Sequence, residues 1–234
     1  NTVVQGSPDV EIEGIYNNRI PNTKLLLHFE GAEGSTTFTD ETGKAVTPNG
    51  NSKLTNNYKK NGIGSGSFDG TNSYLSLLDS VDWDYGTGNF AISAWVYVVD
   101  NTNDFLIYQQ FQAGTHISLI VSSGALSFRS IGGSGSPWNI YISTPSSIVD
   151  TNKWHHVSVV RSGSGGGVTD WHLIVDGIER VTTLGAGAYN CTIDAVAGVL
   201  EIGINRYGAV IYSNGYIDEM EVINGSAIYP NNRM

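Results

Sequence analysis

The stretch Asn89-Phe-Ala-Ile-Ser-Ala-Trp-Val-Tyr-Val-Val99 alternates between two sets of side chains and decides the fold. Successive side chains of a strand point to opposite faces, so this alternation predicts a β-strand with one buried face. The apolar face consists of Phe90, Ile92, Ala94, Val96 and Val98. We expect this face to point into a core between two sheets, which leaves Trp95 and Tyr97 on the outside of their own sheet.

Similar short segments precede and follow this strand, and turn signals such as Asp69-Gly70 and Asp176-Gly177 separate them. The other predicted strands are residues 24–30, 65–68, 73–78, 105–111, 116–121, 125–131, 154–161, 171–175, 179–183, 199–204 and 216–223. Only a short helical turn is expected, around residues 79–85. Turns recurring at about 8–12 residues indicate an all-β fold, a two-sheet antiparallel β-sandwich. We predict one domain over residues 24–234, preceded by an irregular lead-in or docking arm over residues 1–23.

The composition narrows the classes of partner. The 234 residues carry a formal net charge of −10, which disfavours nucleic acid and anionic membrane surfaces as partners. The sequence lacks an apolar run long enough to insert into a membrane. Cys191 is the only cysteine, so an intrachain disulfide is excluded. We interpret the chain as an excised piece of a longer polypeptide.

Four groups of segments carry a resemblance to a known family. They are residues 25–31 with 38–43, residues 66–76, residues 82–96, and residues 154–161 with 173–177, 215–220 and 227–229. Over residues 24–230 the chain resembles the concanavalin A-like lectin/glucanase superfamily, in its laminin-G-like jelly-roll form from bacterial surface and phage virion proteins. The resemblance implies a jelly roll in an extracellular, cell-surface or virion location, with a glycan or other chains of a surface or virion assembly as partners.

The same resemblance implies a structural calcium ion where the first and last strands meet. Glu30, Gly70 and Asp218 stand in the matching motifs, and calcium takes carboxylate and carbonyl oxygens as ligands. The alternative is that Glu30 and Asp218 only cap turns or accept hydrogen bonds from nearby amides. The acidic loop at residues 100–104 is a second candidate, for which a solvated loop is the favoured interpretation.

Candidate ligand-binding residues follow from the way proteins bind sugars, by stacking rings on Trp or Tyr and bonding hydroxyls with polar groups. Alternation predicts that Tyr97, Tyr108 and Gln110 share a shallow outer surface, unless a neighbouring loop packs over it. Loops supply the other candidates, because binding residues collect on loops of rigid sandwiches. These are Trp138, Tyr141, Arg206 and Tyr207. Trp154 begins a strand in a family motif and is expected in the core.

Catalysis is not expected from this sequence. Glycoside hydrolysis uses two carboxyls about 5–10 Å apart, and jelly-roll glucanases place them on one strand face. The nearest string is Asp218-Glu-Met-Glu221, which lies in the closing strand and lacks that spacing. We therefore predict a non-catalytic recognition module that binds a glycan within a larger surface or virion protein. The alternatives are a structural or assembly domain that contacts other proteins, and a glycoside hydrolase or lyase with unrecognised catalytic residues.

Overall fold

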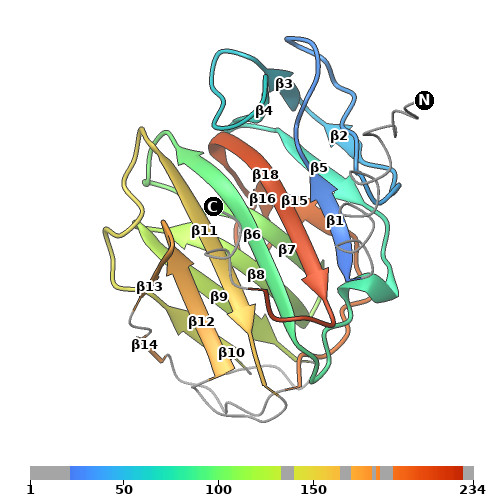
Figure 1. Ribbon diagram of the computed structural model, residues 1–234, viewed down its shortest axis with the longest axis vertical. Coiled ribbons are helices and arrows are strands. Elements are labelled where there is room, and N and C mark those ends of the chain that lie inside the picture. Colours follow the sequence, from blue (N-terminus) through green and yellow to red (C-terminus); the bar gives the residue numbers. More distant parts are fainter. Residues whose placement is uncertain (1–21, 133–139, 164–169, 181–182, 185–191, 229–234) are drawn as a thin grey trace, which may run out of the picture.

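The computed structural model describes residues 22–132, 140–163, 170–180, 183–184 and 192–228. Within these ranges two large antiparallel sheets pack face to face, which confirms the predicted sandwich (Figure 1). In spatial order, sheet A contains β13 (Ile178–Arg180), β12 (Trp171–Val175), β11 (Trp154–Arg161), β6 (Phe90–Val98), β18 (Asn214–Asn224), β4 (Ser65–Asp69) and β3 (Lys53–Thr55), and β1 (Thr23–Leu27) also pairs with β18.

Sheet B forms the second layer, behind β1, β18, β6, β11 and β12 in the view of Figure 1. Its strands, in spatial order, are β14 (Thr183–Leu184), β10 (Ile140–Ser143), β9 (Ala125–Ile131), β8 (Thr115–Ser122), β7 (Phe105–Gln112), β15 (Leu200–Ile202), β5 (Tyr74–Leu77) and β2 (Thr47–Asn49). A separate hairpin joins β16 (Ile204–Asn205) to β17 (Ile211–Tyr212). The expected helical turn is a 3-10 helix, η1 (Val81–Trp83).

The alternation in β6 determines which face enters the core. The five predicted core residues of this strand are each at most 1% exposed, whereas Trp95 and Tyr97 lie on the outer face and are partly exposed. Aromatic side chains from both sheets meet at this level, where Phe90, Phe128 and Trp171 contact one another. The inner faces are thus filled by large apolar side chains, and binding residues have to come from the outer faces and loops.

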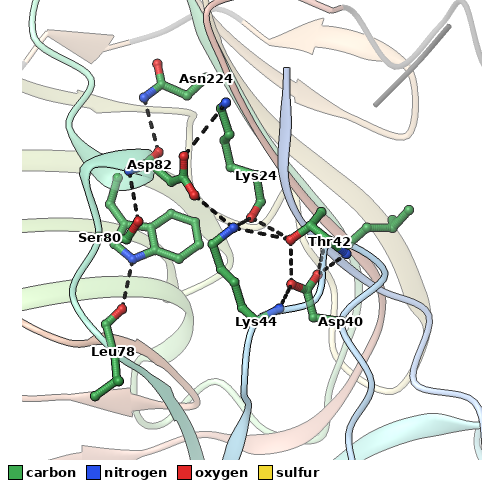
Figure 2. Close-up of polar contacts among 10 residues, drawn as sticks. Lys24, Asp40, Thr42, Lys44, Leu78, Ser80, Asp82 and Asn224 are labelled. Carbon is green, nitrogen blue, oxygen red and sulfur yellow. Dashed lines mark hydrogen bonds and ion pairs between the residues drawn. The ribbon is translucent and has the colours of Figure 1, made fainter. Parts of the chain in front are cut away.

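A cluster of charged groups ties β1 to η1 at one end of the sandwich (Figure 2). The Lys44 ammonium lies 2.9 Å from the Asp82 carboxylate and donates to the Lys24 carbonyl at 2.6 Å. Burial raises the pKa of Asp82, but the hydrogen bond and charge of Lys44, with the charge of Lys24, outweigh burial and leave this pKa lowered. Asp40 accepts the backbone amides of Leu26 and Lys44, which closes the turn that follows β1.

Two further points concern the N-terminal segment and membrane insertion. The predicted lead-in falls almost wholly outside the described residues, so the docking arm stays a prediction. Over the ranges that the structure covers, no helix is both long and apolar enough to cross a bilayer.

Candidate functional site

The outer face of sheet B carries a continuous line of aromatic and basic side chains, here called the sheet B strip: Tyr141, Arg129, His116 and Tyr207. Tyr141 and Arg129 are cross-strand partners, and the guanidinium lies 5.3 Å from the tyrosine ring centroid. At the other end the rings of His116 and Tyr207 lie 4.4 Å apart. Arg129 links the two pairs, because its cross-strand partner on β8 is Ser118, two residues from His116 on the same face. The strip therefore crosses three strands and ends on the β16–β17 hairpin.

The β16–β17 hairpin is held in place by a fully buried amide. Gln109 accepts the backbone amide of Arg206 at 2.8 Å and donates to the side chain of Asn205 at 3.3 Å. Asn205 in turn donates to Asp104 at 3.1 Å and accepts the backbone amide of Tyr207 at 2.9 Å. Tyr207 is 46% exposed, yet the backbone that carries it is fixed by this network. Such preorganisation lowers the entropy lost when a ligand binds.

An ion pair closes the same face beside the hairpin. Both oxygens of Glu201, which is 2% exposed, accept hydrogen bonds from Arg206 at 2.7–2.8 Å. The Arg206 guanidinium lies 5.3 Å from the ring centroid of Tyr74. This pairing raises the pKa of Arg206, mainly through the hydrogen bond to Glu201. Arg206 is therefore a fixed planar group whose side chain is 34% exposed.

His116 is neutral at physiological pH. Burial lowers its pKa to about 4, and the charge of Arg129 acts in the same direction. His116 is only 2% exposed and packs against the Tyr207 ring, so it supports that ring rather than facing solvent. The strip thus offers two tyrosine rings at its ends and the partly exposed Arg129 between them.

The outer face of sheet A has a different character, with two rows of side chains that run across three strands. In one row Trp154, Tyr97 and Tyr216 are cross-strand neighbours, with ring centroids 5.7 Å apart in each step. The next row places Trp95 between two further side chains, those of His156 and Asp218. We call the loop of residues 56–64 that lies over these rows the β3–β4 loop.

Carboxylates hold the β3–β4 loop against sheet A. Asp218 accepts the backbone amides of Lys60 and Asn61, each at 2.9 Å, through Oδ2, and its buried Oδ1 has no partner. Burial raises the pKa of Asp218 to about 6, against the lowering effect of those two amides. Glu30 accepts the Ile63 amide at 3.0–3.1 Å. Both acids thus act as acceptors for turn amides.

The donor set predicted for calcium does not fit a shared ion. Gly70 lies beside Asn214, four residues along β18 from Asp218, which corresponds to about 13 Å of extended strand. Glu30 and Asp218 face amide donors rather than each other. Among the described residues no group of three or more His, Cys, Asp or Glu side chains is placed to hold a metal. A calcium ion therefore stays a prediction without a supporting donor set here.

The structure corrects the placement of Tyr108 and Gln110. Both are fully buried between the sheets, and the Tyr108 hydroxyl donates to Gln110 at 3.2 Å. The cause is a β-bulge between Leu106 and Tyr108, which adds one residue and moves the following side chains to the opposite face. Tyr97 lies on the other sheet, so the shallow surface predicted for these three residues does not exist.

The remaining candidates divide between the two outer faces. Tyr141, Arg206 and Tyr207 lie on the outer face of sheet B or on its hairpin without direct contact between Tyr141 and the other two, Tyr97 lies on sheet A, and Trp138 lies outside the described residues. The prediction that Trp154 lies in the core is wrong, because this residue lies next to Tyr97 on the outer face. Sequence reasoning missed Arg129 and His116. Alternation predicts both positions, because each basic residue is next to an apolar residue that points into the core and must therefore point outward itself.

Comparisons with known proteins agree with this architecture. A family model described as the concanavalin A-like lectin/glucanases superfamily matches residues 69–227. A comparison with curated protein sequences gives no match. Among solved structures, domain 4 of AbnA, an extracellular GH43 arabinanase from Geobacillus stearothermophilus in complex with arabinotriose, is similar with a TM-score of 0.62 and 17% identity. That match covers 90% of this chain and 97% of the other.

Toxin binding domains share the fold as well. The binding domain of botulinum neurotoxin serotype G is similar with a TM-score of 0.64 and 14% identity, over 88% of this chain and 48% of that one. The binding domain of botulinum neurotoxin DC, solved in complex with rat synaptotagmin II, has a TM-score of 0.60 and 15% identity over 88% and 49%. The chain thus spans about half the length of these toxin domains.

Proposed function

Because the chain belongs to the concanavalin A-like lectin/glucanases superfamily, we propose that it is a non-catalytic recognition module that binds a glycan along the sheet B strip. The observation that carries the proposal is the strip itself, with Tyr141 and Tyr207 at its ends and Arg129 and His116 between them. Sugar rings stack on tyrosine faces while their hydroxyls bond to polar groups in the plane. The arabinanase domain solved with arabinotriose supports a sugar as the ligand class.

The carboxylates of this face support a binding role rather than hydrolysis. Hydrolysis requires an acid and a second carboxylate about 5–10 Å away across the sugar. Glu201 lies on this face, but both of its oxygens accept hydrogen bonds from Arg206. We further propose that the module belongs to a larger secreted or surface protein. Each site would bind its glycan with a dissociation constant of about 1 mM to 1 μM, and several copies would add avidity.

The direct test is a glycan array followed by calorimetry on the variants Tyr207→Ala and Tyr141→Ala. Each should weaken binding of the selected glycan by about tenfold, the cost of losing one aromatic stacking contact. Val210→Ala is the matched control, because Val210 lies on the same hairpin, is 53% exposed and lies outside the strip. Equal losses in the control and in Tyr207→Ala would contradict the proposal.

The same assays separate the alternatives. An array without any bound glycan would favour a protein partner, as in the toxin domain solved with synaptotagmin II. Release of sugar from a polysaccharide would instead point to an enzyme. Repeating the array with EDTA tests the calcium prediction, because a calcium-dependent site would lose its ligand.

A further inference from the structure

The exposed side chains of the β3–β4 loop form a second candidate site, separate from the sheet B strip. The loop is rigidly attached, since three carboxylates, from Glu30, Glu33 and Asp218, accept four of its backbone amides at 2.5–3.1 Å. Residues 57–63 are nevertheless exposed side by side along the loop. The attachment fixes the backbone and leaves the side chains of the loop in solvent, as a preformed binding loop requires.

Tyr58 supplies a stacking surface on this loop. One face of its ring lies on Tyr216, with centroids 4.3 Å apart and planes 10° apart, and its edge meets Tyr97 at 5.5 Å. The side chain is still 43% exposed. Because one face is occupied by Tyr216, the exposed area belongs to the opposite face and the rim. A ligand ring would continue the stack outward.

Two lysines stand beside this tyrosine in a chain whose net charge is −10. The Lys60 ammonium lies 4.2 Å from the ring centroid of Trp95, and that of Lys59 donates to the Asn56 carbonyl at 3.4 Å. Within the described ranges neither ammonium lies within ion-pairing distance of a carboxylate. The neighbouring acids Glu30 and Asp218 already accept backbone amides. The loop thus carries two exposed ammonium groups that are not ion-paired within the described ranges, while the carboxylates that hold its backbone accept amide hydrogen bonds.

We propose that Tyr58, Lys59 and Lys60 bind an acidic sugar residue, whose ring stacks on Tyr58 and whose carboxylate or sulfate pairs with the lysines. A flat C–H face and a charged substituent on one ring match a tyrosine face and the ammonium groups of the two residues that follow it in the loop. Long polyanions are disfavoured by the overall negative charge, so the proposed ligand is a single anionic residue that pairs directly with the ammonium groups. The site goes beyond the glycan binding proposed for the sheet B strip and does not depend on it.

The test compares ligands that differ only in charge. Calorimetry is run with trigalacturonate, with its methyl ester, and with a sulfated trisaccharide. The wild-type chain should bind trigalacturonate or the sulfated sugar about tenfold more tightly than the ester, as a charge-assisted hydrogen bond implies. Equal affinity for the acid and the ester, or absence of binding to both charged sugars, would overturn the proposal.

Variants locate the binding on the loop. Lys59→Gln with Lys60→Gln should weaken the charged sugars about tenfold and leave the ester unchanged, whereas Tyr58→Ala should weaken both. Lys153→Gln is the matched control, because Lys153 is an exposed lysine paired with Asp150 on another loop. An equal loss in this control would overturn the assignment to Lys59 and Lys60. Tyr207→Ala should leave trigalacturonate binding intact, which separates this site from the sheet B strip.

Discussion

The two outer faces of the sandwich are covered in physically different ways. On sheet A, aromatic rows lie under a loop whose backbone amides are held by carboxylates, as with Asp218. On sheet B, a hairpin is held by buried side-chain amides, with Gln109 at the centre. The acceptors of the loop amides on sheet A are carboxyl groups, whereas the group at the centre of the sheet B network is a neutral amide. Each outer face therefore has its own sensitivity to mutation and to pH.

The sharpest way to break the sheet B arrangement is Gln109→Ala. The substitution leaves the Asn205 side chain and the Arg206 amide without their buried partner, and it opens a small cavity. We expect the free energy of unfolding to fall by about 3 kcal/mol in urea denaturation. Gln112→Ala, an exposed position at the end of the same strand, should leave stability unchanged. A loss below about 0.5 kcal/mol would show that the hairpin does not depend on Gln109.

Acidification should lower the stability of the folded chain through His116 on sheet B. Its folded pKa of about 4 is depressed below the ordinary value of 6.5, so the unfolded chain takes up the proton first. The contribution of His116 to the free energy of unfolding is fully present above pH 6.5 and is lost as the pH falls through 4. Relative to His116→Gln, the wild-type chain should lose on the order of 2 kcal/mol between pH 7 and pH 4. Parallel stability curves for the two proteins would contradict this expectation.

Sheet A should respond in the opposite direction through Asp218. Its folded pKa of about 6 lies above the ordinary 3.8, so the folded state holds the proton more tightly. The contribution of Asp218 to the free energy of unfolding is fully present below pH 3.8 and is lost as the pH rises through 6. Compared with Asp218→Asn, the wild-type chain should be relatively less stable at pH 7 than at pH 4, by on the order of 1–2 kcal/mol. Chemical denaturation at the two pH values measures this difference, and an unchanged or reversed difference would contradict it.

The sequence predicts the strands and the inner face well wherever side chains alternate regularly. The pattern in β6 correctly assigns every second residue from Phe90 to Val98 to the core face, because a two-residue period is local information. It fails in β7, where the bulge before Tyr108 reverses the assignment. A bulge depends on the partner strand, so the alternation of one segment does not reveal it.

The candidate sites show the same division between local and long-range information. Tyr141 and Tyr207 are identifiable as aromatic residues outside the apolar pattern, but their alignment through Arg129 and His116 depends on the pairing of three strands. The β3–β4 loop was missed altogether. Its segment lacks a periodic pattern, and its position is set by Asp218, which is 158 residues away from Lys60 in the sequence.

The smallest expected effect tests what holds the β3–β4 loop in place. Lys60 contacts Trp95 through its ammonium, and an exposed cation–π contact contributes only about 0.5–1 kcal/mol. Lys60→Gln should therefore lower the free energy of unfolding by about 0.5 kcal/mol, and Lys59→Gln should leave it unchanged. Both are measured by urea denaturation at pH 7. A loss above about 2 kcal/mol in Lys60→Gln would show that the lysine, rather than the carboxylates, anchors the loop, because a surface contact alone does not reach that value.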